Sequence, residues 1–170
     1  MIYSAVARTA FINSHLCGAC RVHWSNRIVD EAFTNLARNR GDGEKFERVR
    51  SLMLRAPPHA AVDALDLPDE IVLPDRHDAH VVGTAIACGA TQIATFNLRH
   101  FPSRTLRPLG IHATHPDVVL ATLLAQAPDT ADSVRKAILR ERRVTGQELG
   151  TALVRAKMRR TALALGLPVK

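Results

Sequence analysis

The sequence has 170 residues, of which 46% are hydrophobic, and a formal net charge of +7, which suits one globular domain with an adequate apolar core. It contains only three cysteines, no signal-peptide pattern, and no apolar run near the roughly 18–20 residues of a membrane span. These features argue against a membrane protein and a disulfide-rich secreted domain, and they predict a cytoplasmic protein with no membrane partner.

Hydrophobic periodicity, capping residues and chain breakers predict alternating helices and short strands. The first predicted elements are a helix over 5–16, a strand over 21–24, a helix over 26–37 capped by Ser25, a turn over 39–44, a helix over 45–54 with a break at 56–58, and a short strand within 62–67. They are followed by a helix from Asp75 to Gly89, strands over 92–96 and 111–113, and helices over 116–127, 132–142 and 147–164. This order is typical of an α/β protein with a parallel sheet.

Residues 73–102 carry the most informative pattern of the chain. Asp75 is placed to cap the helix that comes after it, and Asp78 lies in the first turn of that helix. The predicted strand over 92–96 leads into the polar loop 97–100. In open α/β sheets, ligands bind at the carboxyl ends of the strands, so this loop is a candidate site position.

Two expectations concern how this segment packs. The small residues at 83–85 are expected to let their helix lie close against the sheet. The apolar character of 92–96 predicts a short parallel strand that is covered on both faces.

Positive charge is concentrated at the C-terminal end. Residues 135–170 contain 10 Lys and Arg against 2 Asp and Glu, a net of +8, whereas residues 1–134 contain 13 against 14, a net of −1. The basic residues form two clusters, Arg135, Lys136, Arg140, Arg142 and Arg143, and then Arg155, Lys157, Arg159 and Arg160. An anionic partner such as RNA would suit this distribution. A solvated helix face has the same composition, and both interpretations stay open.

The segment LPDRHDAHVVGTAIACGATQIATFNLRHFP, residues 73–102, resembles the central signature of PIN-domain ribonucleases, in particular bacterial VapC-type toxins. Further matches lie on both sides of it: Trp24-Ser25, Ile28-Val29-Asp30-Glu31, Asn35-Leu36, Pro108-Leu109-Gly110-Ile111 and His115-Pro116-Asp117. The resemblance covers residues 2–124, and the segment over 73–102 is its specific part.

The resemblance implies a PIN-like three-layer α/β/α fold with a short parallel sheet. It places a PIN-like domain in residues 1–127 and a basic helical C-terminal extension in residues 128–170. It also implies a metal-dependent RNA endonuclease that acts as the toxin of a toxin–antitoxin pair. RNA would be the substrate and an antitoxin the protein partner, and a homodimer is compatible with the family.

The resemblance also assigns roles to individual residues. Glu31 and Asp78 are implied ligands of Mg²⁺ or Mn²⁺, and Asp75 is a further candidate ligand. Asn97 would join Glu31 and Asp78 as a catalytic residue by orienting water or phosphate. The candidate RNA-binding residues are Arg99 and His100 in the loop, together with Arg142, Arg143, Arg159 and Arg160, which come from the basic clusters and not from the resemblance. Ions held by carboxylates can activate water and neutralise charge at phosphorus.

Two departures from the family pattern remove negative charge from this site. The family's chain opens with an apolar strand that ends in a metal-binding Asp. Residues 1–4, Met-Ile-Tyr-Ser, match the family's segment directly after that strand, so the strand and its Asp are expected to be missing. His100 stands where the family has a carboxylate; it could bind phosphate when protonated, or ligate a softer metal.

Spacing alone leaves a structural alternative for each of these residues. Asp75 and Asp78 could be an N-cap and its capping-box partner. Glu31 could be a solvated helix residue, and Asn97 could cap a turn after the strand. Only the resemblance joins the scattered carboxylates into one site.

Two short-range pairs have the spacing of metal or redox motifs. His77 and His80 are three residues apart on a helix, but no third histidine lies at a recognised zinc spacing, so both are predicted to be surface or phosphate-facing residues. Cys17 and Cys20 form a C-x-x-C with no second copy, which favours a structural role.

Two functional hypotheses arise from the sequence. The first is a PIN-type endoribonuclease whose basic C-terminal helices hold RNA. The second is a catalytically impaired PIN-like remnant that binds RNA or a protein partner without cutting.

Overall fold

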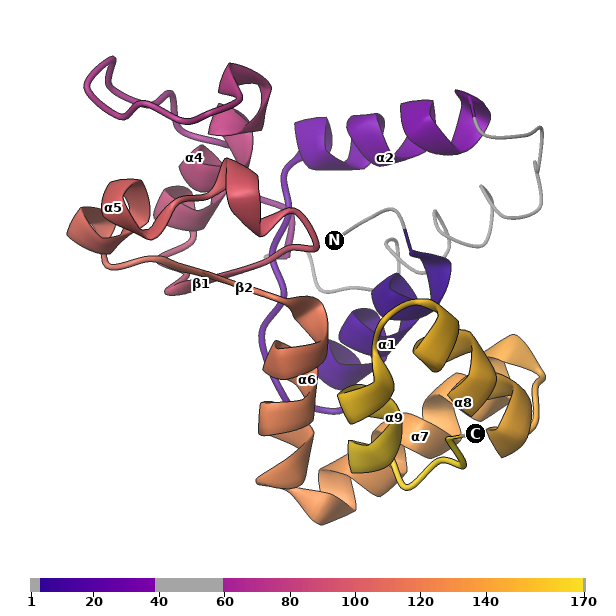
Figure 1. Ribbon diagram of the computed structural model, residues 1–170. Coiled ribbons are helices and arrows are strands. Elements are labelled where there is room, and N and C mark those ends of the chain that lie inside the picture. Colours follow the sequence, from indigo (N-terminus) through magenta and orange to yellow (C-terminus); the bar gives the residue numbers. More distant parts are fainter. Residues whose placement is uncertain (1–3, 39–59, 170) are drawn as a thin grey trace. The chain divides into compact units, whose positions relative to one another are not determined.

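The computed structural model describes residues 4–38 and 60–169 (Figure 1). These residues form two compact units. One unit holds residues 4–22 and 116–169, and the other holds residues 23–38 and 60–115. The elements predicted at 39–44, 45–54 and 56–58 lie outside the described residues.

In the described part of the first unit, every secondary-structure element is a helix. Its elements are α1 (Ala5–Leu16), α6 (Pro116–Ala125), α7 (Pro128–Arg142), α8 (Gly146–Arg155) and α9 (Arg159–Ala164) (Figure 1). Helix α1 packs on α7, and α6 packs on α9. The interior includes the fully buried side chains of Leu120, Leu124, Val134, Ile138, Leu149 and Leu153. The N-terminal helix therefore shares a core with the C-terminal helices.

Helix α1 has the predicted bounds. The Ser4 hydroxyl accepts a hydrogen bond from the Ala7 backbone N–H at 3.4 Å, and Gly18 lies just after the helix with a φ of 80°. Helix α7 begins at Pro128, four residues before the predicted start, because proline is well tolerated in the first turn of a helix. Helix α6 ends at Ala125, two residues before its predicted end.

The single helix predicted over 147–164 is wrong, because the structure contains α8 and α9 with a break between them. Lys157 has a φ of 60°, a left-handed conformation that ends α8. The start of α9 is capped by the buried carboxylate of Asp117 on α6. Asp117 accepts hydrogen bonds from the backbone N–H groups of Arg160 and Thr161, at 3.1 and 2.7 Å, and from the Thr161 hydroxyl at 2.9 Å. This cap lies more than 40 residues away in sequence, so local patterns could not show it.

The sequence predicts a domain boundary between residues 127 and 128, but the two compact units divide the chain at other positions. Helix α6 lies before that boundary, yet it contacts α7 and α9 beyond it. The division into a PIN-like domain and a basic C-terminal extension with separate functions stays a prediction.

The second unit contains helices and a small parallel sheet. Its elements are α2 (Asn26–Arg38), η2 (Arg76–Asp78), α4 (Ala79–Ala87), β1 (Gln92–Ala94), η3 (Leu98–His100), α5 (Ser103–Leu106), η4 (Arg107–Leu109) and β2 (His112–Thr114). Ser25 caps α2 as predicted, since its hydroxyl accepts from the Ile28 N–H at 3.4 Å. Gly89 ends α4 with a φ of 63°, also as predicted. The α/β class is therefore confirmed.

The sheet is shorter than the sequence predicted. Strands β1 and β2 pair in parallel, with Ile93 opposite Ala113. Ile93 is buried but Gln92 is exposed, so the expectation of a strand covered on both faces is wrong. The strands predicted over 21–24 and 62–67 are also wrong: Trp24 forms only an isolated parallel bridge to Ala61, and residues 62–67 contain no strand.

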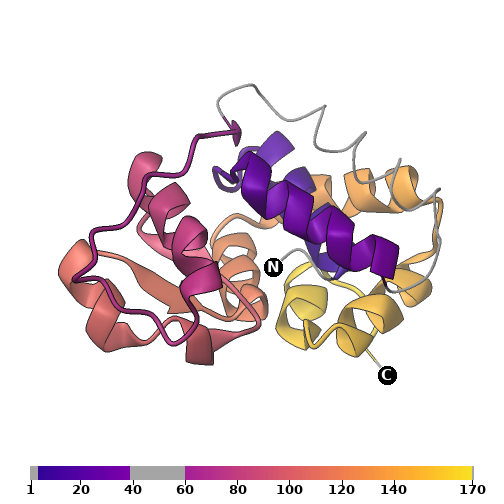
Figure 2. The same ribbon diagram turned by 90° about the horizontal axis from the view of Figure 1, so that it is seen from above.

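Of the small residues predicted to allow close packing of α4, Gly83 approaches an extended segment and Ala85 packs in a core with β1. A Cβ atom on Gly83 would overlap the carbonyl oxygen of Leu65, so only glycine fits at this contact. The extended chain from Ala61 to Pro74 runs beside α4 (Figure 2). On its other side α4 contributes to an apolar core with β1, composed of Leu73, Val82, Ala85, Ile93, Phe101, Leu106 and Ile111.

The expected absence of an N-terminal strand stays a prediction. Residues 1–3 lie outside the described part of the chain, and the first described element is α1.

Candidate functional site

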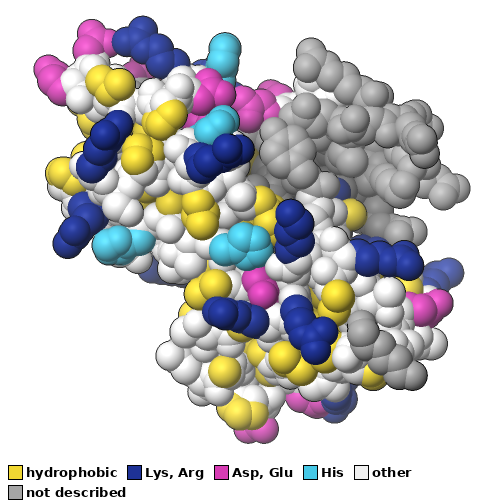
Figure 3. All heavy atoms as spheres, viewed as in Figure 1, with side chains coloured by type: hydrophobic (Ala, Val, Ile, Leu, Met, Phe, Trp, Pro, Cys, Tyr) yellow, Lys and Arg dark blue, Asp and Glu magenta, His cyan; other side chains and the backbone are white. Residues whose placement is uncertain are grey.

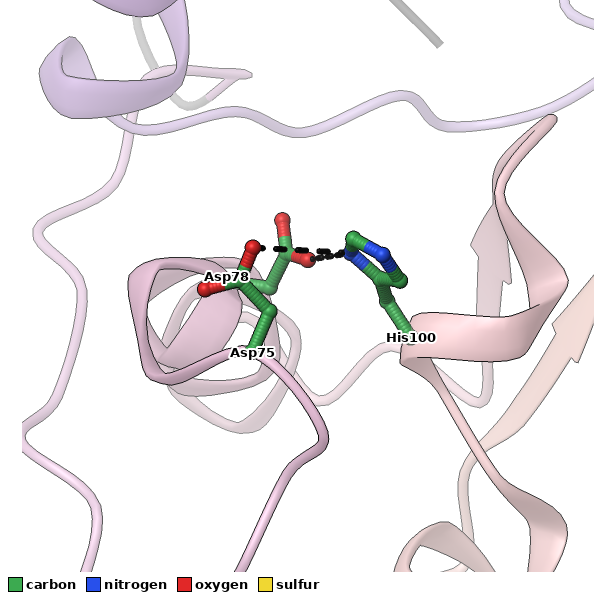
Figure 4. A group of neighbouring side chains, drawn as sticks. All are labelled: Asp75, Asp78 and His100. Atoms are coloured by element: carbon green, nitrogen blue, oxygen red, sulfur yellow. Dashed lines mark hydrogen bonds and ion pairs between the residues drawn. The ribbon is translucent and has the colours of Figure 1, made fainter.

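Two aspartates and a histidine converge in the α/β unit (Figure 4). Asp75 precedes the short helix η2 and Asp78 is its last residue, while His100 ends η3, which comes after β1. One ligand atom from each of the three side chains lies within 4.8 Å of the others. The loop after β1 and the start of α4 therefore meet, as the position at a strand's carboxyl end predicted.

Asp75 has the capping role that its sequence position predicted. Its Oδ1 accepts a hydrogen bond from the backbone N–H of His77 at 2.9 Å, which satisfies a donor at the start of η2. Its other carboxylate oxygen, Oδ2, lies 3.8 Å from His100 Nδ1. Asp75 can thus serve the fold and the cluster at once.

Asp78 faces the cluster and not the helix backbone. Its side chain makes no capping hydrogen bond to α4, so the structure does not support a capping role for it there. Its Oδ2 lies 2.6 Å from His100 Nδ1, a short, charge-assisted contact if the imidazole is protonated. All three side chains are partly exposed. The cluster therefore offers carboxylate oxygens and one imidazole to a ligand that approaches from solvent.

Glu31 lies outside this group of three. It projects from α2 towards the first turn of α4, where its Oε2 is 3.4 Å from Nε2 of His80. The expectation that His80 is a surface residue is wrong, because its side chain is only 3% exposed. Sequence reasoning noticed the His77–His80 spacing but could not tell which of the two histidines faces the interior.

The loop residues Asn97 and Arg99 are exposed beside His100. The Asn97 side chain does not cap η3, although its backbone N–H donates to the Thr95 hydroxyl at 3.1 Å. The capping alternative for Asn97 is therefore not what the structure contains. An exposed carboxamide here is available to a ligand.

The basic residues predicted to bind RNA lie on the helical unit. Arg143 is exposed at the end of α7, and Arg159 and Arg160 are exposed at the start of α9. Arg142 is only partly exposed; it and burial together lower the pKa of Arg8 on α1 to about 10, with burial the larger cause. On the face shown in Figure 3, Lys and Arg side chains are scattered and form no continuous patch.

The C-x-x-C pair does not have the properties of a reactive site. Both cysteines are free thiols. Burial raises the pKa of Cys17 and raises that of Cys20 to about 11, which keeps the thiols protonated at neutral pH. The structural interpretation of this pair is favoured.

Comparison with known proteins identifies the family of this chain. The sequence profile of the PIN domain matches residues 3–99, more than half of the chain. The chain belongs to the PIN domain family. The match includes α2, α4, β1 and all of the candidate residues from Glu31 to Arg99.

A relative with a VapC name supports the narrower resemblance. Over 62 residues the chain is 39% identical to a protein of Mycobacterium tuberculosis named "Putative ribonuclease VapC50". The match covers 36% of this chain and 34% of the relative, so the chain matches about a third of that protein's length. No solved structure matches the chain. Among the helices of the described residues, none is long and apolar enough to cross a membrane.

Proposed function

We propose that this protein is a metal-dependent endoribonuclease of the PIN type and the toxin of a toxin–antitoxin pair. The observation that carries the proposal is the convergence of Asp75, Asp78 and His100 beside the end of β1. Membership of the PIN domain family and a relative named as a ribonuclease support it. RNA is the proposed substrate, an antitoxin is the proposed protein partner, and the cytoplasm is the proposed location. A homodimer is a further possibility of the family, and light scattering of the purified chain tests for it.

The donor set fits a divalent cation. Asp75 and Asp78 supply the oxygen ligands that Mg²⁺ and Mn²⁺ prefer, and Glu31 supplies another carboxylate in the same unit. When bound, such an ion neutralises charge at phosphorus and lowers the pKa of water. Asn97 and Arg99 are exposed on the adjoining loop, where they can orient and bind a phosphate.

His100 has a separate role in this proposal. Its Nδ1 lies against Asp78 and between the two carboxylates, so a protonated imidazole would partly neutralise them. A cation entering the cluster must replace that contact. We therefore expect slower RNA cleavage than a site with a third carboxylate would support.

The exposed arginines of the helical unit are the proposed contacts for RNA phosphates. Arg143, Arg159 and Arg160 can each reach solvent, whereas Arg142 is partly covered. Their contribution is electrostatic and independent of base sequence.

A second candidate function is RNA or protein binding without cleavage. The short Asp78–His100 contact favours it, because a protonated imidazole there would partly neutralise the carboxylates without an added cation. The two candidates differ in a single measurable property, the cleavage of RNA.

The deciding experiment incubates the purified chain with labelled RNA in Mn²⁺, Mg²⁺ or EDTA. Cleavage that needs the ion and falls at least about a hundredfold in Asp78→Asn would support the enzyme, since one ligand and its charge are lost. Asp69→Asn is a matched control, because Asp69 is an exposed aspartate of the same unit. Cleavage that persists in Asp78→Asn would contradict the assignment. RNA binding with no cleavage under any condition would support the second candidate.

A further inference from the structure

The geometry points to a transition-metal site in which Nε2 of His80 and the carboxylate of Glu31 bind the same ion. This inference deepens the proposed function and rests on it in so far as Glu31 is also a proposed ligand there. It adds a nitrogen ligand, His80, and with it a different class of preferred metal. The inference depends on the burial of His80, on its tautomer, and on its distance from Glu31.

The ring of His80 is oriented by its own backbone neighbourhood. Its Nδ1 lies 2.7 Å from the carbonyl oxygen of His77, and because a carbonyl can only accept, Nδ1 carries the hydrogen. In the neutral ring the lone pair is therefore on Nε2. A histidine that donates one ring N–H to a backbone carbonyl and presents its other nitrogen is the usual arrangement of a metal-binding imidazole.

Nε2 of His80 is buried and has no hydrogen-bond partner. Buried polar atoms without a partner are uncommon in folded proteins and require an explanation. The Nε2 atom faces Glu31 Oε2 at 3.4 Å. A protonated imidazole bound to a carboxylate would have its nitrogen about 2.7–2.9 Å from the oxygen, which is clearly shorter.

The separation of 3.4 Å matches that of two ligands on one ion. Zn–N and Zn–O bonds of about 2.0–2.1 Å, at a tetrahedral angle, place their ligand atoms about 3.4 Å apart. The Glu31 side chain is 42% exposed, so one of the two ligand groups is open to solvent. The pair is thus spaced for an ion to bind between the two side chains.

The donor types decide which ions are preferred. An imidazole with a carboxylate suits Zn²⁺ and other borderline transition metals, whereas Mg²⁺ takes oxygen ligands almost exclusively. Another histidine of this unit, His100, shifts the donor set of its own cluster in the same direction. We therefore expect Zn²⁺ to bind this protein more tightly than Mg²⁺.

The test measures Zn²⁺ and Mg²⁺ binding to the metal-free full chain by isothermal titration calorimetry. Glu31→Gln and His80→Gln are each expected to weaken Zn²⁺ binding at least about tenfold, since losing even an outer partner of a ligand costs that much. His80→Gln should leave Mg²⁺ binding unchanged. Asp30→Asn and His77→Gln are the matched controls, because both residues are exposed neighbours, and neither should alter binding.

A second readout reports on the ring nitrogen directly. In nitrogen-detected NMR of the histidine rings, Zn²⁺ should move the Nε2 resonance of His80, assigned by its loss in His80→Gln, and leave Nδ1 protonated. If His80→Gln does not fold, Glu31→Gln carries the test, because its partly exposed side chain is tolerant of an isosteric change.

Three outcomes would overturn the inference. Zn²⁺ affinity could be unchanged in both variants, or the Nε2 resonance of His80 could fail to respond to Zn²⁺. Mg²⁺ and Zn²⁺ affinities could also fall together in His80→Gln, which would indicate a purely structural loss. If Asp78→Asn abolishes metal binding while Glu31→Gln and His80→Gln do not, this inference fails and the proposed function stands.

Discussion

Two aspartates show how differently the two units use a carboxylate. In the helical unit, Asp117 is buried and accepts hydrogen bonds from two backbone N–H groups and the Thr161 hydroxyl. In the α/β unit, Asp78 is partly exposed and lies against His100, with no capping hydrogen bond. A carboxylate whose oxygens are occupied by the backbone stabilises a fold. A carboxylate whose only partner can be displaced is available to bind a ligand.

The largest effect is expected from removing the structural carboxylate. Asp117→Ala should lower the free energy of unfolding by about 3 kcal/mol, because it removes the cap of α9 and leaves buried donors unsatisfied. Urea unfolding followed by circular dichroism measures this. Asp129→Ala, an exposed aspartate in the first turn of α7, is the control. A loss below about 1 kcal/mol for Asp117→Ala would break the contrast between the two aspartates.

The next largest effect tests whether the helical unit also serves RNA. Replacing Arg142, Arg143, Arg159 and Arg160 by Gln should weaken binding to many RNA sequences alike, by about a hundredfold at low salt if all four contact phosphates. The slope of log K against log salt should flatten by about 0.7 for each lost contact.

Arg→Lys at the same four positions is the control for charge, and it should largely retain the slope. An unchanged slope in the Gln variant would mean that these arginines form a solvated surface. Because Arg142 is partly covered, its single Gln variant should change the slope least.

A smaller effect should result from restoring negative charge to the α/β unit. His100→Asp replaces the group against Asp78 by a carboxylate, which favours a hard cation between the side chains. Mg²⁺-dependent RNA cleavage should rise about tenfold, a change of about 1.4 kcal/mol in the activation barrier. His112→Asp, at an exposed position of the same unit, should have no such effect. Lower cleavage by His100→Asp would indicate that the imidazole itself contributes.

The smallest effect concerns an exposed carboxylate of the helical unit. Glu148 accepts hydrogen bonds from the Thr145 backbone N–H and hydroxyl at the start of α8, and these bonds lower the pKa of its carboxyl, the backbone bond most. A folded-state pKa below the unfolded value gives stability that is present above the unfolded pKa, about 4.3, and lost as the pH falls through the folded pKa. Glu148→Gln should therefore cost stability at about pH 7 but not at about pH 3. An equal cost at both pH values would show that the charge of Glu148 contributes nothing.

Local sequence signals were sufficient for much of the fold. Ser25 marked the start of α2, and Gly89 marked the end of α4. The apolar stretch that contains Ile93 correctly predicted a parallel strand, although a shorter one. Caps, breakers and periodicity depend on residues a few positions apart, and such short-range constraints can be read without knowing the tertiary structure.

The candidate site was predictable only in part. The motif over 73–102 identified Asp75, Asp78 and the loop that ends in His100. The structure brings the side chains of Asp75, Asp78 and His100 together. The same motif did not indicate that Glu31 lies against His80, since that contact joins two helices nearly 50 residues apart. A helical histidine has the same local pattern whether it faces solvent or a neighbouring helix.

The sequence by itself determined the positions of most helices, the cap of α2, the end of α4, the parallel strand and the family. Tertiary structure alone decided the break between α8 and α9, the single Trp24–Ala61 bridge and the burial of His80. The first two depend on a partner that is distant in the chain, the Asp117 carboxylate and the Ala61 backbone, and the buried His80 faces Glu31 on another helix. Hydrogen bonds and burial of this kind exist only after the chain has folded, because folding brings such partners within reach.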